Sequence, residues 1–334
     1  MKLYVILPIY NIEVDNDVIN TEIISGYKLI TNETFFNSYK KEIVFNENTD
    51  VYRSLYEDIL IPQSGMSCTR ELAKYILIKE YEVKKEYDFD NKLFHDFMYE
   101  EKGNLNTLIL ILRLVQKGSC QANSFYIFTI GTQARDVTDF STNRDSIHSS
   151  LSSTDEIIYE NKYIISIETI KKLNQASLII RDFSKEKTIP VVYFMQYYNS
   201  ISTYDRIIKL AIVLESSVLA GIKEELNYRL RIRASAFLKR DCQKILNVFY
   251  QLRSCIVHNG SIDTKYFKEI KKIINDEQCS DSKALFVFLS DYVEPLVRDI
   301  LYKSFEIFAK DEKIKNYKDL FSSADVEIFK KITE

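Results

Sequence analysis

The hydrophobic pattern changes character along the chain. Residues 1 to about 60 carry short bursts of alternating apolar and polar residues, separated by connections rich in Asn, Glu and Asp. A period of two is typical of strands with one buried face, so this part predicts a small sheet from "KLYVILPIYNI", "YKLI" and "KEIVF". Helical spacing predicts helices at 67–88 and at 104–117, the second ending near Gly118. The aromatic stretch "SFYIFTIG" predicts a further strand.

A polar segment then separates two kinds of pattern. Residues 141–156, "STNRDSIHSSLSSTDE", have no apolar periodicity and predict a loop at a domain boundary. Beyond it, helical spacing continues to about residue 308, with Pro190 as an expected interruption. We therefore expect an α+β protein. A mixed α/β domain over 1–150, with a sensing or regulatory role left open, precedes an all-α helical bundle over 151–334.

Composition narrows the class of protein. Only 7 Gly and 4 Pro in 334 residues favour long helices over a loop-rich all-β fold. A net charge of -3 excludes a globally basic nucleic-acid coat but not a local basic groove. The five cysteines are far apart and form no Cys-x-x-Cys motif, so neither a disulfide framework nor a metal site is expected. The longest apolar run, "LNTLILILRLVQ", is too short to span a bilayer, and we expect a cytoplasmic protein without membrane contact.

Four predicted helices organise the second half, and the first places a carboxylate among apolar residues. Glu215 lies within the apolar stripe of a helix over 203–222, formed by Ile208, Ala211, Ile212, Val218, Leu219 and Ile222. A buried carboxylate needs a cationic partner, and the two candidates are Arg253 and Arg233. Arg233 lies on the second helix, 223–240, near a core side formed by Leu226, Leu230, Ala234 and Phe237. An ion pair that only holds the bundle together is the favoured explanation of Glu215 and Arg233.

The third helix carries the candidate chemistry in "YQLRSCIVHNG". It is predicted to begin at Asp241, with a core side of Ile245, Val248, Phe249, Leu252 and Ile256. Arg253 and His258 lie about 140° apart on an ideal helix, with Tyr250, Ser254 and Val257 between them. A looser helix end at Asn259-Gly260 could bring the two closer, and a face of this kind suits a symmetric partner. A histidine at a helix C-terminus is also favoured by the helix dipole alone. The fourth helix, 281–309, closes the bundle.

Arginine and histidine together suit RNA cleavage. Histidine titrates near neutral pH and can act as acid or base, while the arginine fork can stabilise a phosphorane. RNA supplies its own nucleophile, the 2′-OH, so no metal or other cofactor is needed. One histidine per chain cannot conveniently be acid and base at once, but a two-fold dimer would bring two to one cleft. The other two histidines, His95 and His148, are expected to be surface or packing residues.

Three stretches of the second half, in this order and spacing, resemble a known protein family. "YDRIIKLAIVLESSVL", "ELNYRLRIRASAFL" and "FYQLRSCIVHNG" make residues about 155–308 resemble the HEPN superfamily, most closely its Apea-like branch. "LILILRLVQKGSC" resembles, more weakly, a segment often found before that domain. The resemblance implies a helical bundle that usually dimerises. Active members are metal-independent endoribonucleases with an Arg-x4-6-His motif, many of them in prokaryotic defence, abortive infection or toxin systems.

Carried over to this chain, the motif assigns Arg253 and His258 as catalytic residues. Ser254 stands where many active members have Asn, Asp or His, and its hydroxyl is no third acid–base group. Supporting roles are expected for Ser254, Tyr250 and Glu215. A basic wall for RNA could come from Arg229, Arg231, Arg233 and Lys239, although a solvated or ion-paired face explains each of these residues as well.

The expected partners follow from this interpretation. RNA, with tRNA among the candidates, is the substrate, and the protein is expected to be a homodimer through the HEPN-like domain. A regulatory or phage-derived trigger protein would control it. The alternative is a non-catalytic HEPN module that binds RNA, a nucleotide or a partner protein. A third possibility is a regulatory subunit that pairs with an unrelated enzyme, such as an antitoxin or nucleotidyltransferase partner.

Overall fold

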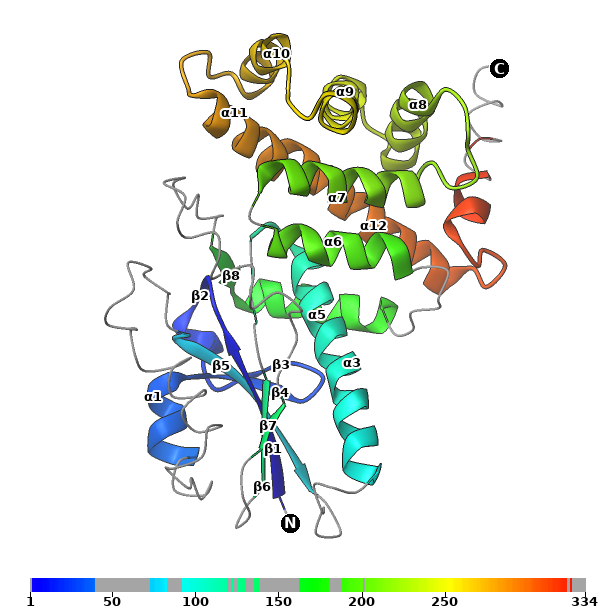
Figure 1. The fold of residues 1–334 in the computed structure, drawn as a ribbon. Helices are drawn as coiled ribbons and strands as arrows, with labels where there is room; N and C mark the ends of the chain where they lie inside the picture. The colour runs from blue at the N-terminus through cyan, green and yellow to red at the C-terminus, as the bar shows by residue number, and fades with distance from the viewer. Residues whose placement is uncertain are drawn as a thin grey trace. The chain divides into compact units, whose positions relative to one another are not determined.

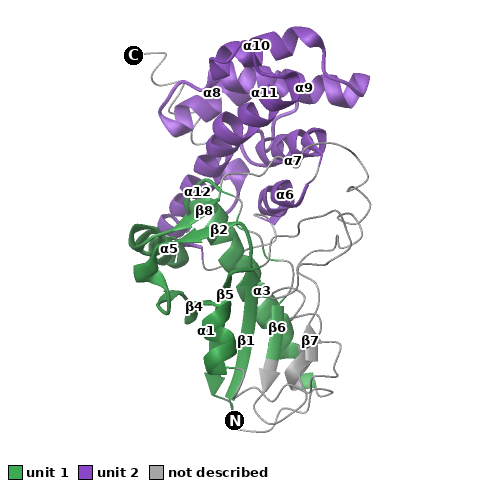
Figure 2. Cartoon of the chain, turned by 90° about the vertical axis from the view of Figure 1, so that its left-hand side faces the viewer, with its two compact units in different colours: residues 1–178 green, residues 179–334 purple. Residues whose placement is uncertain are grey.

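A computed structural model describes residues 2–39, 73–82, 92–118, 120, 122, 125–129, 135–137, 162–180, 188–200, 202–322 and 325 (Figure 1). The chain divides into two compact units, 1–178 and 179–334 (Figure 2). All the described strands lie in the first unit, together with the helices α1 (Asn32–Thr34), α3 (Lys92–Val115) and α5 (Ile167–Ile179), whereas the second unit is helical, so the α+β expectation is confirmed at this level. The loop predicted at 141–156, with His148, lies outside the described residues.

An antiparallel sheet forms the centre of the first unit. Its strands are ordered β3 (Glu22–Ile24), β4 (Tyr27–Thr31), β5 (Tyr75–Glu82), β1 (Lys2–Ile9), β6 (Phe125–Thr129) and β7 (Arg135–Val137). Strand β1 pairs with β5 along its whole length, from Lys2 opposite Glu82 to Ile9 opposite Tyr75. Every residue of β1 after Lys2 is buried, as expected of a central strand covered on both faces. A separate parallel ladder joins β2 (Ile12–Val14) to β8 (Tyr163–Ile165).

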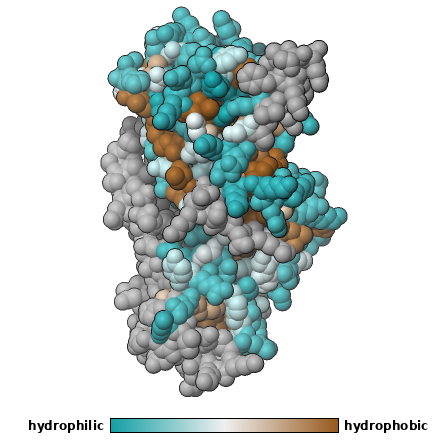
Figure 3. Space-filling view, turned by 90° about the vertical axis from the view of Figure 1, so that its right-hand side faces the viewer, coloured by the Kyte–Doolittle hydropathy of each residue, from teal (hydrophilic) through white to brown (hydrophobic). Residues whose placement is uncertain are grey.

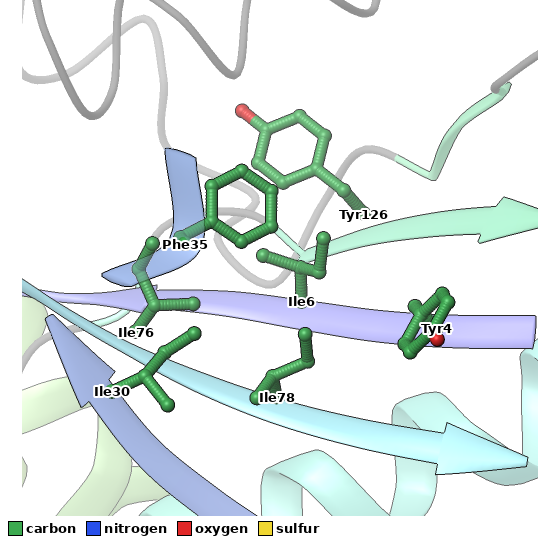
Figure 4. Packing of buried hydrophobic residues seen from close by; sticks show 7 residues of the cluster. All are labelled: Tyr4, Ile6, Ile30, Phe35, Ile76, Ile78 and Tyr126. Carbon is green, nitrogen blue, oxygen red and sulfur yellow. The ribbon is translucent and has the colours of Figure 1, made fainter. Parts of the chain in front are cut away.

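The two faces of this sheet have different cores. Because side chains alternate along a strand, one face gathers a cluster in which Phe35 packs on residues of four strands. The cluster consists of Tyr4, Ile6, Ile30, Phe35, Ile76, Ile78 and Tyr126 (Figure 4). Phe35 follows the short helix α1 (Asn32–Thr34) and opens a π-helical turn, Phe35–Tyr39. A 3-10 turn, Asn16–Val18, lies between β2 and β3.

A buried carboxylate ties the helix α3 (Lys92–Val115) to the other face. Glu101 is 1% exposed and accepts hydrogen bonds from the hydroxyls of Tyr27 and Tyr81, the second at 2.6 Å. Burial, and then the Glu101 carboxylate, raise the pKa of both tyrosines above its ordinary value. They remain neutral donors that satisfy a carboxylate inside the unit.

The helix predicted at 67–88 is wrong, because part of this range forms strand β5. Residues Tyr75–Glu82 lie in the sheet between β1 and β4, and the rest of the predicted helix lies outside the described residues. The apolar run at 76–78 fits a strand that is buried between two neighbours, so pairing with β1 and β4 overrides the local helical spacing. The strand predictions at β1, β4 and β6 and the helix at 104–117 are confirmed; α3 begins earlier, at Lys92. The predicted strand "KEIVF" lies outside the described residues.

The second unit is built from helices. Helix α5 (Ile167–Ile179) ends at the boundary between the units, and the bundle follows. Its helices are α6 (Thr188–Asn199), α7 (Thr203–Ser216), α8 (Leu226–Leu238), α9 (Gln243–Asn259), α10 (Thr264–Ile274), α11 (Asp281–Val287) and α12 (Glu294–Lys310). A π-helical turn, Phe288–Val293, joins α11 to α12 without a break. Helices α6 and α7 run side by side (Figure 1).

The four predicted helices are confirmed, with corrections of detail. Pro190 does not interrupt the pattern, because it lies in the first turn of α6, where its missing N–H costs no hydrogen bond. Of the stripe predicted on 203–222, Ala211, Val218 and Leu219 are buried, whereas Ile208, Ile212 and Ile222 are half-buried. Helix α7 ends at Ser216, and within it the phase differs from the prediction. The buried residues are Ile207, Leu210, Ala211, Val213 and Leu214, because α7 contacts α6, α9 and α12.

A buried polar network joins α6 to α12. Glu294 is 3% exposed; the Tyr198 hydroxyl donates to it at 2.7 Å, and Arg298 donates through Nε at 3.0 Å and Nη2 at 2.8 Å. Each carboxylate oxygen therefore has a partner, as a buried charge requires. None of the described helices is both long and apolar enough to cross a membrane. On the face shown in Figure 3, apolar patches are small and separated by polar side chains.

Candidate functional site

Helices α7 and α9 bring Glu215 and Arg253 together. Nη2 of Arg253 lies 3.0 Å from Oε1 of Glu215 and donates a hydrogen bond to Oε2 at 3.2 Å. Each side chain is 26% exposed, so the pair lies at the edge of the bundle and can be reached by solvent. Of the two partners expected for Glu215, the structure selects Arg253.

The same guanidinium keeps donors available. Its contacts within the described residues involve Nη2 alone, which leaves Nε and Nη1 without a partner there. The Arg253 Cζ atom lies 5.7 Å from the centre of the Tyr250 ring, one turn earlier on α9, within cation–π range. Glu215 and Tyr250 therefore hold one side of the arginine fork while its other side can bind an anion.

Tyr250 is a neutral hydrogen-bond donor in this site. Burial raises the pKa of the Tyr250 phenol, and the Glu215 carboxylate raises it further, although the Arg253 charge opposes the shift. The hydroxyl therefore stays protonated near neutral pH. It can donate to an oxygen but cannot act as the base.

His258 lies at the end of α9 and is exposed. Its ring makes no hydrogen bond or ion pair with the part of the chain that the structure describes. Helix α9 stays regular to Asn259 and ends at Gly260, whose φ of 70° and N–H bond to the Ile256 carbonyl form the predicted C-cap. A loosened end that would turn His258 toward Arg253 is therefore not found. Within one chain the two residues keep a separation of about 140° around the axis.

The other end of α9 follows the prediction in part. Helix α9 begins at Gln243, so its N-cap is Cys242 and not the predicted Asp241. Asp241 lies one residue earlier, and its Oδ1 accepts a hydrogen bond from the Gln243 amide at 3.0 Å. Ser254 is half-buried, between Arg253 and His258 on the wheel. The buried core side of α9 is Leu246, Val248, Phe249 and Leu252.

The basic wall expected on α8 is smaller than predicted. Arg233 is 3% exposed, and its guanidinium donates to both oxygens of Asp325 and, at 2.8 Å, to the Val218 carbonyl. That burial excludes Arg233 from RNA contact, and its ion-pair partner is Asp325 rather than Glu215. Arg229 is half-buried, 3.6 Å from Glu225.

Two further basic residues were expected in the wall. Lys239, the C-cap of α8, is exposed. Arg231 donates to the Asn227 carbonyl at 3.3 Å, and its Cζ atom lies 6.0 Å from the centre of the Tyr228 ring. The wall is thus reduced to the exposed Lys239 and the half-buried Arg229 and Arg231.

A chain of amides between α8 and α9 was not predicted. The Asn227 amide donates to Oδ1 of Asn247 at 3.0 Å, and the Gln251 amide donates to the same oxygen at 3.4 Å. Asn247, Gln251, Ser254 and His258 follow one another at spacings of four, three and four along α9, which places them on one face. That spacing is visible in the sequence and is the signal that could have found the chain.

Within the described ranges, no three His, Cys, Asp or Glu side chains gather as a metal site would require, and Cys120, Cys242, Cys255 and Cys279 are free thiols. Comparisons with protein-family models, with curated proteins and with solved structures found no match to this chain. No relative therefore indicates the chemistry of the site, which depends on the residues present.

Proposed function

We propose that the protein is a metal-independent endoribonuclease that cleaves RNA by attack of the 2′-OH. One observation carries the proposal: Glu215 holds the Arg253 guanidinium through Nη2 and leaves its other nitrogens able to bind an anion. The exposed His258 lies on the same helix. Arg253 binds the equatorial oxygens of the reacting phosphate through Nε and Nη1. Glu215 and Tyr250 fix its orientation, and the Ser254 hydroxyl lies beside the same face.

His258 moves the protons. A neutral imidazole removes the 2′-OH proton as the 2′-oxygen forms its bond to phosphorus, and a protonated imidazole gives a proton to the leaving 5′-oxygen. The P–O5′ bond breaks, leaving a 2′,3′-cyclic phosphate and a 5′-OH. Because each chain carries one such histidine, a two-fold dimer supplies the second. The about 140° between Arg253 and His258 within a chain favours residues of two chains acting on one phosphate.

The biological setting rests on the resemblance described above. It is a cytoplasmic enzyme of a prokaryotic defence, abortive-infection or toxin system, whose activity in the cell is controlled by its first unit or by a regulatory or phage-derived trigger protein. RNA, including tRNA, is its substrate.

The test is a cleavage assay in EDTA with labelled single-stranded RNA and tRNA. Wild type should cut, while Arg253→Ala and His258→Ala should each lose at least about 100-fold in rate. Gln278→Ala, which removes an exposed loop amide, is the matched control and should cut like wild type. A 2′-deoxy nucleotide at the scissile position should stop cleavage, and equal cutting of DNA would refute the mechanism.

A non-catalytic module is the second candidate, favoured by the separation of Arg253 from His258 within one chain. In that case Arg253 is an anion clamp for RNA, a nucleotide or an acidic segment of a partner protein. RNA binding that is lost in Arg253→Ala but unchanged in His258→Ala, without cleavage by any variant, would support it.

A further inference from the structure

The amide chain between α8 and α9 has unused hydrogen-bonding capacity. The Asn227 Oδ1 atom is buried and has no hydrogen-bond partner in the part of the chain that the structure describes. Both side-chain hydrogen bonds of the amide chain converge on the Asn247 Oδ1 atom, so the Asn247 amide and the Gln251 carbonyl make no bond among the described residues. Asn247 and Gln251 are half-buried, so a ligand can reach this amide donor and this carbonyl acceptor. The remaining donor and acceptor are suited to a ligand edge that offers both.

An exposed aromatic ring adjoins this chain. Tyr228 follows Asn227 on α8 and is 57% exposed. The Arg231 guanidinium lies at the edge of cation–π range of its ring, with Cζ 6.0 Å from the centre. Exposed aromatic rings accompanied by arginine are the platforms on which proteins stack unpaired bases. We call these five residues, Asn227, Tyr228, Arg231, Asn247 and Gln251, the amide seam.

We propose that the amide seam binds one nucleobase of a single-stranded RNA and so selects where the RNA is cut. The base stacks on Tyr228, and the Gln251 carbonyl and Asn247 amide pair with its hydrogen-bonding edge. The inference rests on the proposed function for its substrate, but it concerns residues outside the Arg253–His258 site.

Position along α9 relates the seam to the reaction. Gln251 lies seven residues before His258 on the same helix face, with Ser254 between them, which is about 10 Å along the axis. The base that it reads therefore belongs to a nucleotide beside the scissile one, and the seam determines specificity without touching the reacting atoms.

Binding of labelled 2′-O-methyl RNA 12-mers, one for each base, tests the seam without cleavage. Wild type should prefer one base. Tyr228→Ala should weaken binding of all four 12-mers by roughly 5- to 100-fold, whereas Gln251→Ala should bring the four affinities together. Gln251→Glu keeps the size of the side chain and the acceptor that meets the base, so it is the conservative control and should keep the order of preference. Gln278→Ala should bind like wild type.

The outcomes separate the two proposals. If Gln251→Ala keeps the wild-type base preference, or Tyr228→Ala binds as tightly as Gln278→Ala, the amide seam is refuted. The nuclease is judged separately, by the loss of cutting in His258→Ala. A preference that depends on Gln251 in a protein that does not cut RNA supports the seam and contradicts the nuclease. Failure of wild type to bind any of the 12-mers overturns the seam, and failure to cut RNA as well overturns both.

Discussion

At the scale of the residue, the Glu215–Arg253 pair is better explained by orientation than by stability. Both side chains are 26% exposed, and ion pairs reached by solvent typically contribute about 0 to 1 kcal/mol. Orientation is worth more, since a guanidinium that must meet a phosphate loses rate when it is free to turn. The pair also occupies one nitrogen of the fork only, so it aims Arg253 without blocking it.

Substituting Glu215 should therefore separate activity from stability. Glu215→Ala is expected to lower the RNA cleavage rate by roughly 10- to 100-fold and to change the free energy of unfolding by less than about 1 kcal/mol. Glu215→Gln keeps both side-chain heteroatoms near Arg253 and should lose less activity. Asp299→Ala is the control, because it breaks the Arg240–Asp299 pair, whose side chains are each 48% exposed. Cleavage kinetics and urea unfolding give the two readouts; equal activity in Glu215→Ala and Asp299→Ala would contradict the orienting role.

The sequence identified Glu215 and Arg253 but could not decide how they pair. A carboxylate in an apolar stripe requires a cation, and two arginines on neighbouring helices satisfied that requirement. The partner of Arg233, Asp325, lies 92 residues further along the chain, and no periodic pattern reports a contact of that range. The structure decides the pairing, because Arg233 is buried and bonded to Asp325 and to the Val218 carbonyl. Arg253 is therefore the partner of Glu215.

At the scale of the element, the periodicity of apolar residues predicted the helices of the second unit. It failed for β5, where pairing with other strands decides the secondary structure. Helices α7, α8 and α9 follow the predicted order because each carries an apolar side long enough to define its period. Strand β5 was mistaken for a helix, since Ile76, Leu77 and Ile78 are buried on both faces of a strand that lies between two neighbours, and show no alternation. The identity of those neighbours, β1 and β4, is set by long-range pairing that a local window cannot contain.

Two buried tyrosines show how the second unit holds its elements together. The Tyr198 hydroxyl on α6 completes the Glu294 network on α12, whereas the Tyr317 hydroxyl is buried and finds no hydrogen-bond partner among the residues that the structure describes. Tyr198→Phe should lower the free energy of unfolding by about 1.5–3 kcal/mol, because it removes a bond to a buried carboxylate. Tyr317→Phe should raise it by about 1 kcal/mol, because it removes a polar atom that folding leaves unpaired.

Each variant is the other's control, since both remove one oxygen from a buried ring. Urea unfolding of the full chain measures the two changes, and the difference in sign is the critical result. Destabilisation of similar size in both variants would mean that loss of the oxygen acts through packing and not through its hydrogen bond.

At the scale of the whole molecule, the formal net charge of -3 gives no general attraction to RNA. Binding must therefore come from a few well-placed groups, which the proposals assign to Arg253 and the amide seam. The proposed reaction needs an acid and a base at once. Because each chain carries one histidine at the end of α9, a second chain has to supply the other.

Mixing active and inactive chains tests that requirement. Increasing amounts of His258→Ala are exchanged into a fixed amount of wild type, and the RNA cleavage rate is measured. If both histidines of a dimer act on one phosphate, mixed dimers are inactive. Random exchange then lowers the rate to about half at equal amounts and to about a quarter at threefold excess. Added Gln278→Ala, an active chain, should instead contribute its own activity. An undiminished rate after verified exchange would mean that each chain works alone, and the acid or the base would then have to be sought outside His258.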